Sequence, residues 1–244
     1  MLRSHGCFFV AGGSRGMTVS TFRPDGSVES TSVDGMVNMS EPGSTWTNNR
    51  NSAGDSATDS AIDFGANLQQ DSADPSTFWA AWSRGIMLFD TSSLPNGDAV
   101  TAATIALTAN FRDDDLNLNV SIVASNPASN TALVAGDFDS FPGLTGAMTK
   151  QAADVDIGGM TVDSETATTF TLNATGRGNI SKIGVSKFGI VIANDADDSE
   201  PGMGSSSDRS YIKFFSADEA EAGDERPLLT VTHVSTFTPK AMMF

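Results

Sequence analysis

The stretch Gly85-Ile-Met-Leu-Phe-Asp90 (G-I-M-L-F-D) is a continuous apolar run with polar residues on both sides. Its length and borders predict a strand that is buried on both faces in the middle of a sheet. The next residues include Pro95 and Asn96-Gly97, which are typical of a turn. Beyond the turn, Val100–Phe111 alternates from Ala103 on, and this pattern predicts a strand whose core face carries Ile105, Leu107, Ala109 and Phe111.

Similar signals continue on both sides of these two strands. Leu116–Val123 alternates between apolar and polar residues, which predicts a strand with one buried face. Residues 40–76 and Asn194–Asp208 are rich in Ser, Asn, Asp and Gly and are expected to be loops. Short strands and frequent turns, without long amphipathic helices, favour an all-β antiparallel sandwich. The remaining predicted strands are Ser32–Met39, Thr168–Leu172, Lys187–Ala193, Tyr211–Phe215 and Pro227–His233.

The pattern divides the chain into three parts. Residues 31–235 are expected to form the sandwich. Residues 1–30 show no periodicity and are expected to be an irregular N-terminal arm, either disordered or partner-binding. Residues 236–244 form a short apolar C-terminal tail. Exposed apolar surface usually needs a partner, so we expect the tail to dock on a neighbouring subunit through Met242, Met243 and Phe244.

Charge and composition exclude several classes of partner. The chain has 30 acidic against 14 basic residues, a net charge of −16. This charge repels phosphates and anionic lipids, so we expect no binding to nucleic acid. No apolar run is long enough to span a bilayer, so we expect no membrane insertion. The single cysteine, Cys7, excludes an internal disulfide. Cys7–Ala11 is too short for the apolar region of a signal peptide, so we expect another export route, such as release from a lysed cell.

Three motifs follow one another in a recognisable order between Trp82 and His233. They are Ser83–Pro95 (S-R-G-I-M-L-F-D-T-S-S-L-P), Ala102–Leu107 (A-A-T-I-A-L), and Phe215–Glu219 (F-S-A-D-E) with Arg226–Thr232 (R-P-L-L-T-V-T). This order resembles the DNRLRE-type jelly-roll domains, including their phage and metagenomic variants, although the hexapeptide that names the family is absent. The resemblance implies a jelly-roll fold related to carbohydrate-binding modules, and a domain that binds glycans or packs in a virion.

The first of these motifs has a structural explanation of its own. We expect Asp90 to accept local amide hydrogen bonds where the buried strand ends. Arg84 precedes the apolar run, and we expect its guanidinium to pair with a carboxylate of a neighbouring strand. Both are folding roles, and we favour them over functional ones.

The sequence contains no catalytic motif. A hydrolytic triad needs a histidine beside a nucleophile, and the chain has only His5 and His233. His233 ends the last predicted strand, where a structural histidine is favoured over a base. There is no zinc-binding, Walker or dinucleotide-binding pattern. We therefore expect a protein that is not an enzyme.

Two groups of residues are candidates for ligand binding. Asn194–Glu200 offers the oxygen ligands that Ca²⁺ prefers, through Asp195, Asp197, Asp198 and Glu200, although a solvated acidic loop is the favoured alternative. Calcium is the only cofactor that the sequence suggests. Trp46, Trp79 and Trp82 are the candidates for stacking on sugars. The alternative is that they cap the core, which we favour for Trp82 and leave open for Trp79.

Two functional hypotheses follow. The first is a structural protein of a virion or extracellular assembly, of the phage tail or capsid-decoration type. Its partners would be other copies of itself or other virion and surface proteins, with glycan attachment as an additional role. The alternative is a secreted or cell-surface carbohydrate-binding module. Both place the protein in a virion or outside the cell.

Overall fold

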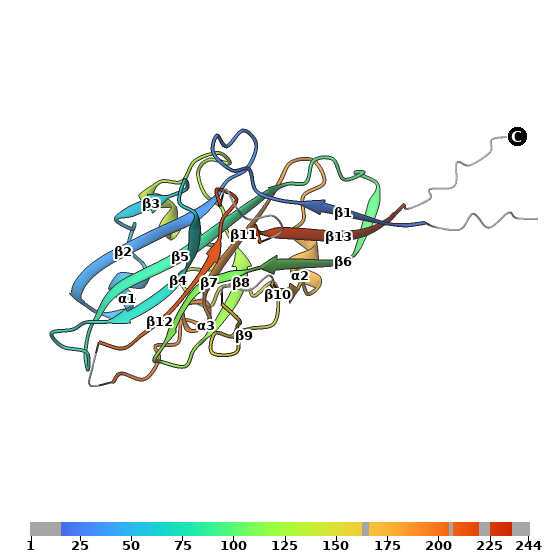
Figure 1. The fold of residues 1–244 in the computed structure, drawn as a ribbon. Helices are drawn as coiled ribbons and strands as arrows, with labels where there is room; N and C mark the ends of the chain where they lie inside the picture. Colours follow the sequence, from blue (N-terminus) through green and yellow to red (C-terminus); the bar gives the residue numbers. More distant parts are fainter. Residues whose placement is uncertain (1–15, 163–165, 205–206, 220–224, 236–244) are drawn as a thin grey trace, which may run out of the picture.

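The molecule consists of two antiparallel β-sheets with little helix (Figure 1). The computed structural model describes residues 16–162, 166–204, 207–219 and 225–235. The predicted all-β class, an antiparallel jelly-roll β-sandwich, is confirmed. No helix in the described ranges is long and apolar enough to cross a membrane. The helices are α1 (Trp46–Arg50), the 3-10 helix η1 (Ala135–Asp139), α2 (Ala174–Gly178) and α3 (Ala193–Asp197).

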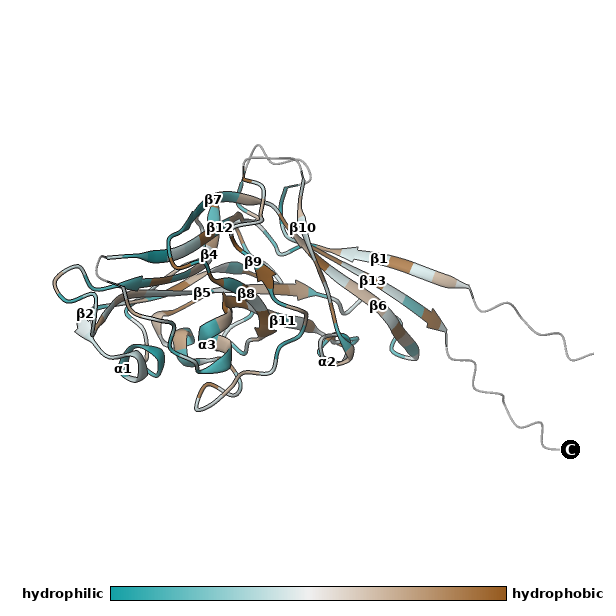
Figure 2. Cartoon of the chain, turned by 90° about the horizontal axis from the view of Figure 1, so that it is seen from below, coloured by the Kyte–Doolittle hydropathy of each residue, from teal (hydrophilic) through white to brown (hydrophobic). Residues whose placement is uncertain are grey.

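The smaller sheet joins strands from opposite ends of the chain. Its order is β1–β13–β6–β10, so the first strand of the described chain pairs with the last. In both views β1, β13 and β6 extend beyond the rest of the molecule (Figures 1 and 2). The strands are β1 (Met17–Phe22), β13 (Leu228–Ser235), β6 (Asp98–Leu107) and β10 (Thr168–Thr171).

The larger sheet curls around the core as a half-barrel. Its main path is β7–β12–β4–β5–β11–β8–β9, and β2 adds to β5 with β3 beside it. Thr108 alone separates β6 from β7, so a nearly continuous run of chain passes from one sheet to the other. The strands are β7 (Ala109–Asp114), β12 (Arg209–Phe215), β4 (Asp63–Gln70), β5 (Trp79–Asp90), β11 (Val185–Ile192), β8 (Asn119–Ala124), β9 (Val155–Asp156), β2 (Asp34–Ser44) and β3 (Ser56–Thr58).

Strand β5 has three strand partners, and a strand has only two edges. Strand β2 pairs with residues 79–87 of β5, β4 with residues 79–83 and β11 with residues 85–90. Because the β2 pairing overlaps both other stretches, β4 and β11 share the opposite edge and separate near Gly85. An added Cβ at Gly85 would lie 2.6 Å from Ile190 Cγ2 and 2.8 Å from Phe64 Cδ2. Only glycine fits where the sheet forks.

The predicted central strand is confirmed as β5, which is buried from Trp82 to Phe89. Two boundaries differ from the prediction. Met17–Phe22, assigned to the arm, is strand β1, and residues 1–15 lie outside the described residues. Residues 40–76, expected to be a loop, contain α1, β3 and β4. Strand β4 buries Phe64, but its small and amide residues (D-F-G-A-N-L-Q-Q) give a weak apolar alternation.

Candidate functional site

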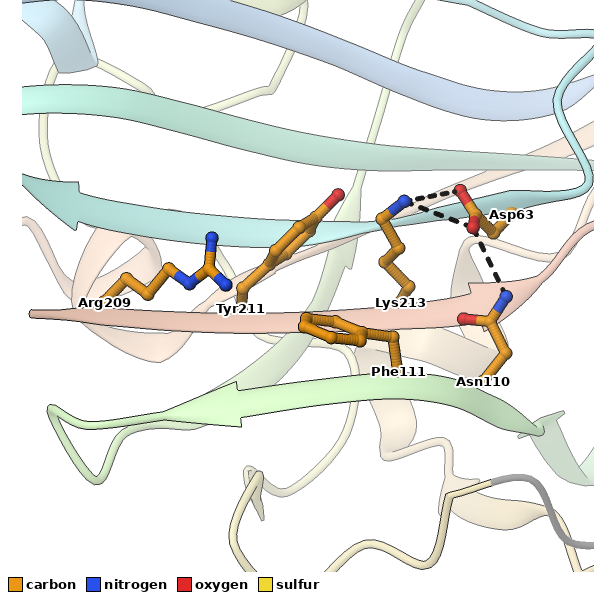
Figure 3. Close-up of a pocket in the computed structure, with 6 residues that line it drawn as sticks. All are labelled: Asp63, Asn110, Phe111, Arg209, Tyr211 and Lys213. Carbon is orange, nitrogen blue, oxygen red and sulfur yellow. Dashed lines mark hydrogen bonds and ion pairs between the residues drawn. The ribbon is translucent and has the colours of Figure 1, made fainter.

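A shallow groove of about 350 Å³ lies on the outer face of three neighbouring strands, β4, β12 and β7 (Figure 3). Alternate residues of β12 form its middle, because Ser210, Ile212 and Phe214 turn into the interior and leave the others outside. The groove is lined by Asp63, Asn110, Phe111, Arg209, Tyr211 and Lys213.

A β-bulge turns Phe111 into this groove. Lys213 pairs with Phe111, but Phe214 pairs with Ala109, so Asn110 is an extra residue of β7. An extra residue reverses which face the following side chains occupy. Phe111 was predicted on the core face with Ala109, and that prediction is wrong because of the bulge. Phe111 is instead 38% exposed.

The aromatic part of the groove is a pair of rings. The Phe111 and Tyr211 centroids lie 5.7 Å apart with their planes at 63°. The Arg209 guanidinium lies 5.9 Å from each centroid, and Lys213 Nζ lies 5.5 Å from the Tyr211 ring. Partial burial raises the pKa of the Tyr211 hydroxyl, so it remains a hydrogen-bond donor at neutral pH.

The polar part of the groove is balanced in charge. Lys213 Nζ lies 3.1 and 3.2 Å from the two Asp63 carboxylate oxygens, and Asn110 Nδ2 donates to Asp63 at 3.3 Å. Arg209 pairs with Asp113 at 2.7 Å. Burial disfavours the charge on Lys213, but the hydrogen bonds and electrostatic interactions with Asp63 and Tyr211 together outweigh it, so the pKa of Lys213 is raised. Each cation thus already has an anionic partner.

Two amide oxygens on this side of the sheet have no hydrogen-bond partner among the residues that the structure describes. They are Asn110 Oδ1 and Asn67 Oδ1, and Asn67 is only 7% exposed. Asn67 of β4 pairs with Tyr211, so its side chain lies on the same face as the groove. Buried acceptors without a partner are costly to the folded state.

The three tryptophans lie elsewhere. Their exposed fractions are 6% for Trp46, 0% for Trp79 and 1% for Trp82, so none presents an exposed ring to a sugar. Their burial agrees with the alternative that the tryptophans cap the core. They pack together, with the Trp46 ring 5.5 Å from Trp79 and 4.4 Å from Trp82.

The predicted calcium ligands contact this tryptophan cluster. Helix α3, which begins directly after β11, carries Asp195 and Asp197. Each indole donates to one of these acids: Trp46 to Asp198 (3.3 Å), Trp79 to Glu200 (2.7 Å) and Trp82 to Asp195 (3.0 Å). Asp197 instead pairs with Lys150 at 2.8 Å. The four acids therefore do not converge on one point, and no set of three or more acidic, histidine or cysteine residues within the described ranges could hold a metal ion.

Two buried arginines complete the cluster. Arg84 contacts both carboxylate oxygens of Asp195, Nε to Oδ2 at 2.7 Å and Nη2 to Oδ1 at 2.9 Å. Arg50 Nε lies 3.2 Å from Asp195 Oδ1. The predicted pairing of Arg84 with a carboxylate is confirmed, although its partner lies on the helix after the neighbouring strand. Asp90 accepts from the Ser92 amide at 3.0 Å, as predicted.

A second arrangement was missed by sequence reasoning. Ser20 Oγ lies 3.0 Å from His233 Nε2, and His233 Nδ1 lies 2.6 Å from Asp98 Oδ2. The three residues come from β1, β13 and β6, which are adjacent in the smaller sheet. Their order matches the contacts of a hydrolytic triad. The three residues lie on strands that are far apart in the sequence, so their spacing along the chain does not indicate that they are in contact.

These contacts join strands in the interior. His233 is 3% exposed, and Ser20 lies opposite Val231, which is 0% exposed, so both side chains face the inner layer. A recess of about 380 Å³ between β6 and α2 touches Asp98 but is not lined by Ser20 or His233. A hydrolase also needs donors placed to bind an oxyanion. We interpret the contacts as a clamp across three strands.

We expect a fluorophosphonate probe to leave Ser20 unlabelled, because Ser20 is partly buried with its side chain on the inner face, and its hydrogen-bond partner His233 is only 3% exposed. Mass spectrometry of the treated protein measures this directly. Labelling of Ser20 that disappears in His233→Gln, while circular dichroism stays native, would instead identify a serine hydrolase.

A scan of the sequence against protein-family models matches no family, and a search of the curated proteins finds no match. The predicted docking residues Met242, Met243 and Phe244 lie outside the described residues, as do Cys7 and His5. The groove on β4, β12 and β7 is the exposed site whose chemistry supports recognition of a ligand.

Proposed function

We propose that this chain is a non-enzymatic jelly-roll domain of a virion or extracellular assembly that recognises a neutral glycan through the groove on β4, β12 and β7. The observation that carries the proposal is an aromatic pair on the outer face, the exposed Phe111 and the partly buried Tyr211, next to amide and carboxylate groups. A pyranose has apolar C–H faces and a rim of hydroxyls, and it needs both kinds of contact. The alternative context, a secreted or cell-surface carbohydrate-binding module, would use the same groove.

Charge favours a neutral ligand over an anion. Lys213 and Arg209 are each neutralised by an aspartate, so an anionic ligand would have to displace Asp63 or Asp113. A neutral sugar can contact the rings and polar groups of the lining without breaking either ion pair. The groove is also shallow and open, so a single site should bind weakly.

We expect Tyr211→Ala to weaken glycan binding by about tenfold or more (~1.4 kcal/mol), because the substitution removes the ring and the hydroxyl together. A glycan array identifies the ligand, and calorimetry on the best hit measures the loss. Tyr211→Phe keeps the ring and should lose less. Ile183→Ala, at a site that is 80% exposed and outside the groove lining, serves as the matched control.

The outcomes are distinct. An array without hits contradicts the proposal, and so does a hit whose affinity is unchanged in both Tyr211→Ala and Phe111→Ala. Both rings lie on the outer face, so we expect the variants to keep the native melting temperature. An unchanged melting temperature excludes unfolding as the cause of any loss of binding.

A further inference from the structure

Strand β1 is an open edge. It stands at the end of the smaller sheet, and β13 is its only strand partner among the residues that the structure describes. Its opposite edge carries the alternate N–H and C=O groups of Met17–Phe22. Such an edge is a template for pairing with another chain.

The sequence of β1 contains none of the features that usually protect an edge. Met-Thr-Val-Ser-Thr-Phe has no charged residue, proline or glycine, and its pairing with β13 runs without a bulge. In Figure 2 the strand is white to brown along its length. By contrast, β7 at the end of the larger sheet carries Arg112, Asp113 and Asp114. The protection is therefore missing at β1 in a chain that uses it elsewhere.

The outer face of the smaller sheet also carries no charge. The register with buried partners identifies the side chains that point away from the interior. Met17 and Val19 are 75% and 61% exposed. The outward residues are Met17, Val19 and Thr21 of β1; Leu228, Thr230, Thr232 and Val234 of β13; Ala99, Thr101, Ala102, Thr104 and Ala106 of β6; and Thr169 and Thr171 of β10.

The net charge of the chain indicates which partner fits this edge. Two copies that each carry −16 repel each other wherever their acidic surfaces meet. This repulsion is smallest where two copies meet through an uncharged strand edge and an uncharged sheet face. Two identical copies each supply such an edge and such a face. A two-fold axis beside β1 would set two β1 strands antiparallel and join two four-stranded sheets into one. The strands project from the molecule (Figures 1 and 2), which leaves room for a second copy.

We propose that the protein forms a two-fold dimer by antiparallel pairing of strand β1 with β1 of a second copy. The pairing extends the smaller sheet across the dimer and does not involve the groove on β4, β12 and β7. The dimer would present two grooves, which raises the avidity of a weak site for a repeated glycan. The dimer and the glycan site can nevertheless each exist without the other.

Sedimentation velocity of the full chain over a wide range of concentrations tests the proposal. We expect a monomer–dimer equilibrium. Val19→Lys combined with Thr21→Lys should raise its dissociation constant at least tenfold, because lysines of the two copies meet across the shared edge. Ile183→Lys, also a change of an exposed apolar residue to lysine, should leave the equilibrium unchanged. Melting curves show whether each variant is folded.

Hydrogen exchange of the wild-type protein separates edge pairing from other contacts and needs no variant. The β1 amides should exchange more slowly as concentration rises through the dimer range. A chain that is monomeric at every concentration overturns the proposal. A dimer whose β1 amides stay unprotected, or which survives both lysines, also overturns it. None of these measurements uses a glycan, so failure of the glycan proposal is detected separately.

Discussion

Asp195→Ala is expected to lower the free energy of unfolding by about 3–5 kcal/mol, because it removes the single carboxylate shared by two buried arginines. Asp195, Arg50 and Arg84 are each 0% exposed. In a chain of this length, that loss corresponds to a fall in melting temperature of roughly 6–20 °C. Thermal and urea unfolding followed by circular dichroism measure it.

The size of the effect follows from what remains after the substitution. The Arg84 guanidinium keeps its bonds to the carbonyls of Phe138 and Arg50, but it loses both contacts with a carboxylate. Arg50 loses the closer of its two acidic partners, and Asp198, at 3.4 Å, is partly exposed. Uncompensated charge in the interior costs much more than a lost surface pair.

The neighbouring acid on the same helix supplies the control. Asp197→Ala removes one negative charge from α3, but Asp197 pairs with Lys150 at the surface. Its expected cost is below about 1 kcal/mol. Equal stabilities of the two variants would mean that Asp195 does not hold the core together. Trp82→Phe, which removes one indole donor to Asp195 and part of the buried ring but keeps the carboxylate, provides an intermediate case if Asp195→Ala does not fold.

The tryptophans and the acids were predicted as two separate ligand sites, and the structure joins them in one internal cluster. Trp46 and Asp198 are separated by 152 positions in the chain, so their contact depends on how the sheets close. The local sequence shows only which chemical groups are present. Indoles can stack on sugars and carboxylates can bind calcium, but indoles can also donate hydrogen bonds to carboxylates. Arg84 was predictable because a cation beside a buried strand needs a nearby carboxylate.

The groove could not be predicted from the sequence for a different reason. The continuous apolar run predicted β5, and apolar alternation predicted β6, where every second residue faces the core. Alternation assigned Phe111 to the interior. The apolar pattern up to Ala109 does not reveal that Asn110 is an extra residue in the strand. Register depends on the partner strand, which the sequence of β7 alone does not specify.

Asp34→Asn is expected to stabilise the protein near pH 8 and to flatten the fall in stability with rising pH. Full burial raises the pKa of Asp34 from 3.8 to about 8, and the nearby Asp218 and Glu29 charges add to this; the amide of Ala217, which donates to Asp34, opposes it. The folded state therefore keeps a proton that the unfolded chain releases above about pH 4. Between these two pKa values the unfolded state binds fewer protons, so stability falls as pH rises.

The stability that protonated Asp34 contributes is complete below the unfolded pKa of 3.8 and is lost by about pH 8. One pKa unit corresponds to about 1.4 kcal/mol, so the loss across this window amounts to a few kcal/mol. Asparagine resembles the protonated acid and cannot ionise, and it still accepts from Ala217. Urea unfolding of wild type and Asp34→Asn from pH 4 to pH 8 should therefore diverge with increasing pH. The exposed Asp139→Asn removes the same formal charge and should run parallel to wild type. Parallel curves for Asp34→Asn as well would show that this carboxyl is ionised in the folded protein.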